Sequence, residues 1–335
     1  MDINYSVIIP VYNAEKYLEP CLHSLEKQSF KDCEFIIWND GSTDNSIQII
    51  EKYATDKRFR IFENKNMGAA IARQRAINES KGKYILFLDS DDVVAENLLE
   101  TIDSMMDDSI DLLQYGSTEK IDQLSNTEPL KWEVYDKDMF TENFIKRVLI
   151  DGNEGVVLWD KVFVKKILVN CLKNYPYSML EDYVFIMRYS EHVNKYCKTS
   201  KILHFYRYVN NSLSKRLNPE WYQILLYVQN LKRDFMERMG IVSKADQIHA
   251  AWWYVRYTKN FILNNLYLIK RDNLWEVIKS KELAEESNIL SDTEFDNNFA
   301  KNVRNQRYRI VINNIYIEAM WRNICKKIRN IFLER

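Results

Sequence analysis

A run of apolar residues from Lys83 to Leu88 ends in three closely spaced carboxylates, Asp89, Asp91 and Asp92. The run is long enough for one buried strand, and the acids repel one another unless a cation lies among them. Oxygen ligands on a short turn suit Mg²⁺ or Mn²⁺, which usually share their coordination with substrate phosphates. We therefore predict a metal and diphosphate site at the C-terminal end of a central strand, where open α/β sheets bind ligands.

The acidic triplet has a second interpretation, a polar turn with a helix N-cap, since Asp is common at both places. A calcium-binding EF-hand is a third. Asp89, Asp91 and Glu100 fall at its first, third and twelfth positions, but Val93 and Val94 occupy the fifth position and that of the obligatory glycine. We exclude the EF-hand, and the other two interpretations stay open on these residues alone.

The first hundred residues alternate between short apolar runs and helical patterns. We expect strands at 6–9, 34–38, 60–62 and 83–88, with a helix after the first strand that Asn13 caps and another at 69–80. This alternation predicts an α/β fold with a Rossmann-like, mostly parallel sheet flanked by helices. The first turn lacks GxGxxG and the chain lacks GxxxxGK[ST], which argues against NAD or FAD binding and against a P-loop NTPase.

Further along, the pattern predicts helices at 96–106 and 141–149 and strands at 111–115 and 202–209, with a hairpin or loop at 117–139. Glu181 and Asp182 begin another predicted helix. Acids in the first turn of a helix stabilise its dipole, and by themselves the two residues need no further explanation.

The character of the sequence changes beyond Pro219, since residues 221–335 contain one glycine, Gly240, and no proline. Apolar residues recur there at helical spacing, which predicts a helical C-terminal region of about four helices. We therefore expect two domains, a nucleotide-binding and catalytic one at 1–215 and a helical one at 216–335.

The last predicted helix, at 308–335, is both apolar on one face and basic. Residues 301–335 contain nine Lys or Arg against two Glu. A basic amphipathic helix with aromatic residues is attracted to an anionic membrane surface. A helix packed on the catalytic domain with a solvated basic face is the alternative, and both stay open. The residues expected on the apolar face are Ile310, Ile317, Trp321, Ile324, Ile328 and Ile331.

The composition excludes several classes of protein. The net charge of −1 gives no general attraction to nucleic acid, and five scattered cysteines without a CxxC pair fit free thiols better than disulfides or a zinc site. The N-terminus has no basic region of a signal peptide, and no apolar run approaches the ~18 residues of a membrane span. We expect a cytoplasmic protein, free or peripheral at the inner face of the cell membrane, and leave a homo-oligomer open.

Five segments within the first hundred residues resemble, as a set, the motifs of one known protein family. They are VIIPVYN at 7–13, QSF at 28–30, NDGSTD at 39–44, NMG at 66–68 with Ala72 and Arg73 after it, and FLDSDD at 87–92. In order and spacing they closely resemble the family 2 glycosyltransferases of the GT-A fold. The resemblance continues more thinly through WDK at 159–161, Glu181-Asp182 and 206–207, and is absent after about residue 214.

The resemblance implies a donor site for a nucleotide sugar, with UDP as the expected nucleotide. In the family, the first strand and its loop, together with the NDGS loop, hold the nucleoside. This implies that Pro10, Tyr12 and Asp40 contact uracil and ribose, that Arg73 lies nearby and that Ser90 belongs to the donor site. Asp40 suits such a role, because a carboxylate at a strand end accepts hydrogen bonds from a base N–H or a ribose hydroxyl.

The resemblance also assigns roles to the acids. Asp91 first and Asp89 second are the expected ligands of Mn²⁺ or Mg²⁺, and Asp92 is expected to cap the next helix instead. Inverting transfer needs a base that takes the proton from the attacking hydroxyl. In the family an acidic pair about ninety residues after the metal motif supplies it, which implies Asp182 as the base and Glu181 as the second choice.

Four residues carry weaker expectations. Trp159 and Lys161 are expected in an acceptor pocket, because an aromatic ring is a good platform for a sugar, although a core tryptophan is an equal alternative. His204 and Arg207 are expected near the diphosphate, and a structural position on the strand is the equal alternative. The acceptor is expected to be a saccharide or a lipid-linked saccharide in surface polysaccharide or glycoconjugate synthesis.

The chain lacks the QxxRW signature of processive synthases, which favours transfer of a single sugar. Two rivals remain. A catalytically silent GT-A protein would bind a sugar nucleotide or a partner without turnover. A nucleotidyltransferase would carry a glycine-rich loop with an arginine after the first strand, where this chain has VYNAE at 11–15.

Overall fold

The computed structural model describes residues 3–124, 129–150, 156–169, 171, 175, 177, 179–209 and 218–333, with the backbone alone at residues 271 and 323–333. The chain divides into two compact units. The first comprises residues 1–145 and 155–212, and the second comprises residues 146–154 and 213–335. Residues 146–154 therefore group with the helical unit, although they precede much of the first unit in the sequence.

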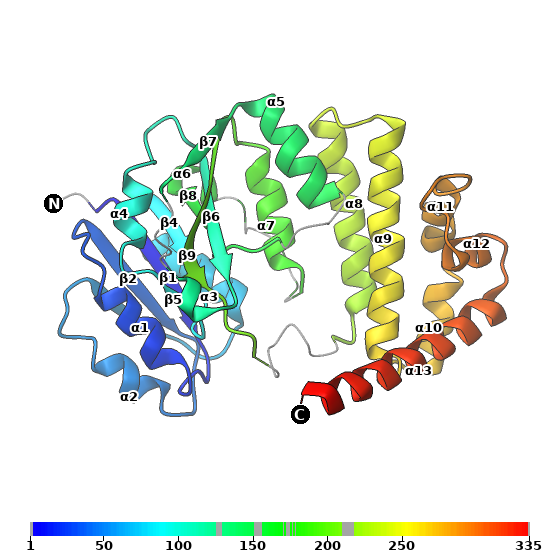
Figure 1. Ribbon diagram of the computed structural model, residues 1–335, viewed down its shortest axis with the longest axis horizontal. Helices are drawn as coiled ribbons and strands as arrows, with labels where there is room; N and C mark the ends of the chain where they lie inside the picture. Colours follow the sequence, from blue (N-terminus) through cyan, green and yellow to red (C-terminus); the bar gives the residue numbers. More distant parts are fainter. Residues whose placement is uncertain are drawn as a thin grey trace. The chain divides into compact units, whose positions relative to one another are not determined.

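The first unit is built on a mixed sheet (Figure 1). Its described strands are β1 Tyr5–Val11, β2 Cys33–Asn39, β3 Phe59–Glu63, β4 Tyr84–Phe87, β5 Val93–Val94, β6 Leu112–Thr118, β7 Trp132–Tyr135, β8 Lys161–Val164 and β9 Tyr196–Phe205. Their order is β3-β2-β1-β4-β8-β6-β9-β5, and β7 pairs with β9. Strands β1 to β4 are parallel, and β8 is antiparallel to both β4 and β6. The predicted Rossmann-like sheet is confirmed.

Strands β1 and β2 lie at the centre of this parallel part and are buried on both faces. Every residue of β2 is buried, and in β1 only Pro10 is partly exposed. A strand covered on both sides reads as a continuous apolar run rather than an alternating one, which explains the sequence signal. The register pairs Tyr5 with Cys33 and Val11 with Asn39, so that the two strands end level with each other.

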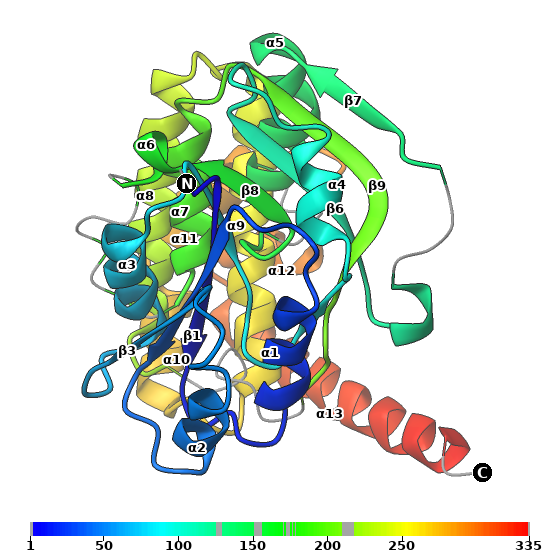
Figure 2. The same ribbon diagram turned by 90° about the vertical axis from the view of Figure 1, so that its left-hand side faces the viewer.

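Helices cover both faces of this sheet. Those of the first unit are α1 Leu18–Glu26, α2 Ser46–Glu51, α3 Ala69–Glu79, α4 Leu98–Asp103, α5 Lys137–Phe140, α6 Lys165–Leu168 and α7 Glu181–Ser190, with the short η1 Ile121–Gln123. The π-helical η2 Thr141–Ile150 begins in the first unit, and its residues from Lys146 onward belong to the second. Figure 2 shows α1 and α3 on opposite sides of β1 and β3. The predicted stripe Leu18, Leu22 and Leu25 is fully buried in the core on the α1 side.

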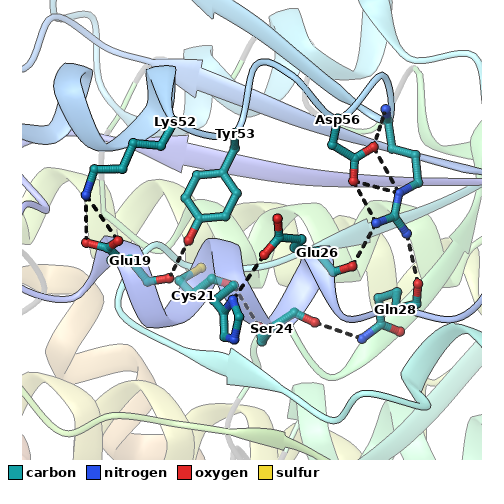
Figure 3. Close-up of polar contacts among 10 residues, drawn as sticks. Glu19, Cys21, Ser24, Glu26, Gln28, Lys52, Tyr53 and Asp56 are labelled. Atoms are coloured by element: carbon teal, nitrogen blue, oxygen red, sulfur yellow. Dashed lines mark hydrogen bonds and ion pairs between the residues drawn. The ribbon is translucent and has the colours of Figure 1, made fainter.

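Polar contacts at the surface join α1 to the segment that begins with α2 (Figure 3). Lys52 forms an exposed ion pair with Glu19 at 3.1 Å, and the Tyr53 hydroxyl donates to the Glu19 carbonyl at 3.2 Å. The Arg58 guanidinium donates to the carbonyl of Gln28 at 2.9 Å. An exposed ion pair contributes at most about 1 kcal/mol, so the apolar stripe of α1 holds this helix in place more than Lys52 does.

Two predicted elements are wrong in detail. Helix α1 begins at Leu18 after Tyr17, not at a cap on Asn13, because Asn13 takes a left-handed backbone with φ of 49° and uses its side chain elsewhere. The strand predicted at 202–209 is β9, which begins six residues earlier and ends at Phe205. Its first residues pair with β6 and β7, and such long-range pairing leaves no local signal in the sequence.

The second unit is helical. In the described part of the chain its helices number six rather than the predicted four: α8 Trp221–Arg238, α9 Lys244–Asn265, α10 Arg271–Ile278, α11 Lys281–Ile289, α12 Asn298–Arg304 and α13 Tyr308–Leu333. The side chains of Ser243, Ser280 and Asn297 cap the starts of α9, α11 and α12 by accepting backbone hydrogen bonds. Within the described residues, no helix is both long enough and apolar enough to cross a membrane.

Candidate active site

The Arg73 guanidinium brings Asp89 together with the adjacent pair Glu181 and Asp182, which lies far from Asp89 in the sequence. Its Nη2 donates to Asp89 Oδ1 at 2.9 Å, and its Nη1 lies 3.4 Å from Asp182 Oδ1 and 3.8 Å from Glu181 Oε1. Arg73 is buried on α3, Asp89 follows β4, and the two other acids open α7. The tips of elements that are remote in the chain thus share one cation.

The start of α7 directs this acidic pair. Leu180, just before the helix, has a φ of 61°, which a bulky residue rarely adopts. Glu181 and Asp182 are then in the first turn, where the helix dipole favours their charged forms. Strained backbone of this kind is often found at functional sites. The predicted helix start is therefore correct, and the two acids face Arg73 from it.

Burial shifts the ionisation of this cluster. Burial raises the pKa of Glu181 to about 7, and the adjacent Asp182 adds to the rise. Burial also raises the pKa of Asp182, while the charge of Arg73 opposes that rise. The three acids in turn raise the pKa of Arg73 against its own burial, so Arg73 stays charged. A carboxylate with a raised pKa is a better proton acceptor at neutral pH than an exposed one.

The acidic loop after β4 contains one acid, Asp91, that has no hydrogen-bonded side-chain partner in the described part of the chain. Burial, followed by repulsion from Asp92 and Asp89, raises the pKa of Asp91 to about 6. Among the described residues, no side chain donates a hydrogen bond to the Asp91 carboxylate. Asp89 is partly exposed beside it. Asp91 and Asp89 offer oxygen ligands that suit a hard divalent cation, although Asp89 is ion-paired with Arg73 and within the described chain no group of three or more His, Cys, Asp or Glu is arranged as a metal site.

Asp92 and His204 form a fully buried pair behind this loop. His204 Nε2 lies 3.1 Å from Asp92 Oδ2, and the backbone N–H of Arg207 donates to Asp92 Oδ1 at 2.8 Å. One expectation is therefore wrong, because Asp92 does not cap the next helix, which begins after Asn97. For His204, which is buried on β9, the structural position on the strand is the alternative that holds, and not the position near a diphosphate. A carboxylate and an imidazole that pair across the fold give no local sequence signal.

Arg207 lies against the acidic loop, and its place near a diphosphate stays a prediction. Its Nε donates to the carbonyl oxygen of Asp91 at 3.0 Å, and its guanidinium carbon is 5.2 Å from the centre of the Tyr17 ring. The charge of Arg207 also lowers the pKa of Asp91 against the larger effects of burial and the neighbouring acids. Arg207 therefore adds positive charge at the edge of the acidic loop.

Asp40 organises the loop that follows β3. Its carboxylate accepts hydrogen bonds from Asn64 Nδ2 at 2.7 Å, from Met67 N at 3.0 Å and from Gly68 N at 2.7 Å. Gly41 next to it has a φ of 77°, and a Cβ there would lie 2.8 Å from the Asn66 nitrogen. Only glycine fits this position without a shift. Most of the hydrogen bonds that the buried Asp40 carboxylate can accept thus come from the protein itself.

Asn13 joins the first loop to the NDGSTD loop, a role that sequence reasoning missed. Its Oδ1 accepts from the backbone N–H of Thr43 at 2.8 Å, and its own N–H donates to Ser42 Oγ at 3.1 Å. The left-handed backbone of Asn13, which asparagine tolerates well, makes both contacts possible. Tyr12 stands beside it with 41% of its surface exposed, and Pro10 is partly exposed. The expected nucleoside residues therefore lie on two loops that are tied together.

The side chains of Trp159 and Lys161 lie in different environments, one partly exposed and the other buried. The partly exposed Trp159 stacks on His204, with ring centres 4.3 Å apart, and on Tyr206 at 5.6 Å. Lys161 is 1% exposed, and its ammonium donates to the Val157 carbonyl at 2.9 Å and contacts the Asp160 carboxylate. A lysine enclosed in this way cannot line an acceptor pocket, so the structure corrects that expectation. Trp159 retains accessible surface for such a role.

Ser90 lies between Asp89 and Asp91 and is partly exposed. The elements that carry these groups, β1, β2, β4, α3, α7 and β9, all belong to the first unit. An acidic loop at a strand end, a buried arginine and an acidic helix start thus lie together, the combination that the resemblance to nucleotide-sugar-dependent transferases leads us to expect.

Comparison with known proteins gives the same class. The family model described as glycosyl transferase family 2 matches residues 6–163. An uncharacterized glycosyltransferase of Haemophilus influenzae is 34% identical over 184 residues, which cover 54% of this chain and 70% of that protein. The glycosyltransferase YibD of Escherichia coli is 28% identical over 261 residues, covering 72% of this chain and 75% of the relative.

A solved structure has the same fold. The crystal structure of S. aureus TarS 1-349 in complex with UDP-GlcNAc superposes with a TM-score of 0.70 at 19% identity, covering 96% of this chain and 92% of that chain. This chain belongs to glycosyltransferase family 2 and has the GT-A fold with a helical C-terminal region.

Proposed function

We propose that this glycosyltransferase inverts configuration as it moves one sugar from a UDP-sugar to a hydroxyl of a saccharide or lipid-linked saccharide. The observation that carries the proposal is the position of Arg73, which contacts Asp89 on the acidic loop and Asp182 on α7. The cluster supports the proposal, because it would bring a donor-binding loop and a proton acceptor within reach of one reaction. The UDP-GlcNAc bound to TarS, which shares this fold, supports UDP as the carrier.

In this proposal Asp182 is the general base. The acceptor hydroxyl oxygen attacks the anomeric carbon, the bond from that carbon to the diphosphate oxygen breaks, and the electron pair leaves with UDP. Asp182 takes the hydroxyl proton, which needs a carboxylate that is ionised yet basic. The raised pKa of Asp182 and its restraint by Arg73 suit this balance. Glu181 is the second choice for the base.

Asp91 and Asp89 would hold Mn²⁺ or Mg²⁺ together with the diphosphate. When bound, such a metal supplies Lewis-acid stabilisation of the charge that develops on the departing nucleotide. Asp91 is the first ligand in this proposal because its carboxylate has no described side-chain donor, whereas Asp89 is already bound to Arg73. Arg207 adds a positive charge next to Asp91.

The two tied loops would bind the nucleoside. Tyr12 exposes its ring for stacking on uracil, and Pro10 and Ser90 flank the same strand ends. Asp40 holds the loop through the Met67 and Gly68 N–H groups, and we propose that its remaining acceptor capacity faces the base or the ribose. Trp159, stacked on His204, would offer its accessible surface to the acceptor sugar. The product would be a surface polysaccharide or another glycoconjugate.

The test is a thermal-shift screen of nucleotide sugars with Mn²⁺, followed by measurement of nucleotide release from each sugar that stabilises the protein. Binding stabilises the folded protein by RT ln(1 + [L]/Kd), so at equal concentrations the nucleotide sugar that binds most tightly raises the melting temperature most. We expect a UDP-sugar to give the largest shift and to be turned over when acceptor is added. Stabilisation without turnover by any saccharide or lipid-linked acceptor would instead indicate a silent sugar-nucleotide-binding protein.

A further inference from the structure

Helix α13 packs on the second unit through a face that the sequence pattern did not single out. Val311, Ile315 and Ala319 are 1%, 1% and 3% exposed, and they follow one another at intervals of four residues. Glu318 beside them is ion-paired with Lys259 of α9 at 2.8 Å. These contacts attach the first half of α13 to the helices of its own unit, and they leave the other side of the helix free.

The opposite side of α13 carries a stripe of exposed apolar residues. Ile310, Ile317 and Trp321 are 45%, 53% and 58% exposed, and at intervals of seven and four residues they share one face of the helix. Met320, adjacent to this stripe, is 50% exposed. Isolated surface hydrophobics are ordinary, but a row of large ones along one helix marks an interaction surface. The expected stripe is therefore real in its described part, and packing within the unit does not use it.

Positive charge surrounds this stripe. Arg307 and Arg309, just before and at the start of α13, are exposed. The acid of the described part of the helix, Glu318, is neutralised by Lys259 and by Arg322, whose Nη2 lies 3.0 Å from it. Residues 301–335 as a whole carry nine basic residues and two acids. Arg304 is paired with Asp296 at 2.9 Å. Among the described residues, the surface that remains therefore combines large apolar side chains with the exposed Arg307 and Arg309.

We propose that the exposed face of α13 binds the anionic surface of a lipid bilayer, with the helix lying in the plane of the interface. Apolar side chains of such a helix enter the boundary between headgroups and acyl chains, and tryptophan is favoured at that depth. Basic residues nearby are attracted to acidic headgroups. A second copy of this chain is a poorer occupant, because pairing the same face would bring like charges together. The proposal is independent of the sugar that the enzyme transfers.

The experiment uses the full chain and sedimentation with vesicles. One set of vesicles contains phosphatidylcholine alone and the other contains phosphatidylcholine with phosphatidylglycerol. The test variant is Ile317→Ser combined with Trp321→Ser. The matched control is Leu268→Ser, which removes an apolar side chain that is 65% exposed outside α13. A second variant, Arg307→Gln with Arg309→Gln, removes charge and leaves the apolar stripe intact. Circular dichroism on heating checks that every variant is folded.

We expect the unmodified chain and the Leu268→Ser control to bind anionic vesicles, and neutral vesicles to bind at least about tenfold less protein. The serine double variant should bind vesicles about tenfold less. The glutamine double variant should lose the electrostatic part of vesicle binding, which added salt also weakens. Absence of binding by the unmodified chain would overturn the proposal, as would unchanged binding by the serine variant. Light scattering that shows an oligomer in the unmodified chain and a smaller species in the serine variant would assign the face to a second copy instead.

Discussion

Arg73 and Asp182 are 109 positions apart in the sequence, and their side chains lie 3.4 Å from each other. The same guanidinium binds Asp89, so one buried cation links the loop expected to hold the donor with the carboxylate expected to accept the proton. An arginine in this position can hold both acids ionised and fix their geometry, because its planar donors reach two carboxylates at once.

The first prediction concerns the base. Asp182→Asn should lower kcat by roughly 10²- to 10⁴-fold, because the amide cannot take the proton from the acceptor, while affinity for the donor stays the same. Steady-state turnover and donor titration by thermal shift measure the two effects separately. Glu181→Gln is the matched control and should lose much less turnover. A larger loss in Glu181→Gln than in Asp182→Asn would transfer the role of base to Glu181.

The second prediction concerns pH. A base with a raised pKa works only when it is deprotonated, so kcat/KM should fall as the pH drops through that pKa. Arg73 lowers the pKa of Asp182, and Arg73→Gln should therefore move the acid limb of the profile to higher pH. Arg73→Lys keeps a charge and should restore part of the shift. An acid limb that stays in place in Arg73→Gln would show that the two residues are not coupled in catalysis.

The third prediction concerns the metal. Removing divalent ions with EDTA should abolish transfer, and Mn²⁺ should restore it. Asp91→Asn should also lose the extra thermal stabilisation that Mn²⁺ adds to the UDP-bound protein, since it removes one carboxylate from the loop. Asp108→Asn, with a carboxylate 90% exposed at the surface, is the control for a simple change of charge. Full activity in EDTA would remove Asp89 and Asp91 from their proposed roles.

The fourth prediction tests the structural role of Lys161. Its ammonium and the Asp160 carboxylate form a buried pair, and Gln114 donates to the same carboxylate at 2.7 Å. Lys161→Ala should lower the free energy of unfolding by about 3–5 kcal/mol, because it leaves a buried charge without its partner. Urea unfolding measures this change. Lys52→Ala, which breaks an exposed pair, should cost at most about 1 kcal/mol. A fully stable Lys161→Ala protein with weakened acceptor binding would return Lys161 to the acceptor site.

The sequence predicted the parts of the site that depend on short segments. The strand that contains Pro10 and the strands that precede Asp40 and Asp89 are largely continuous apolar runs. Asp40 and Asp89 lie on the same side of the sheet because parallel strands present their C-terminal ends at one edge. The start of α7 at Glu181 was also predicted. Sequence reasoning failed for Lys161 and left two alternatives for His204, because burial of a charged or titratable side chain depends on how the fold packs around it.

The order of apolar and polar residues along this chain determined the α/β class, the acidic loop and the helical character of the C-terminal region, since each of these is encoded within a few neighbouring residues. The tertiary structure decided which groups meet. It placed Arg73 between Asp89 and Asp182, enclosed His204 against Asp92, and packed α13 through Val311 rather than Ile317. Pairing across the fold is set by long-range packing, which a periodic pattern does not record.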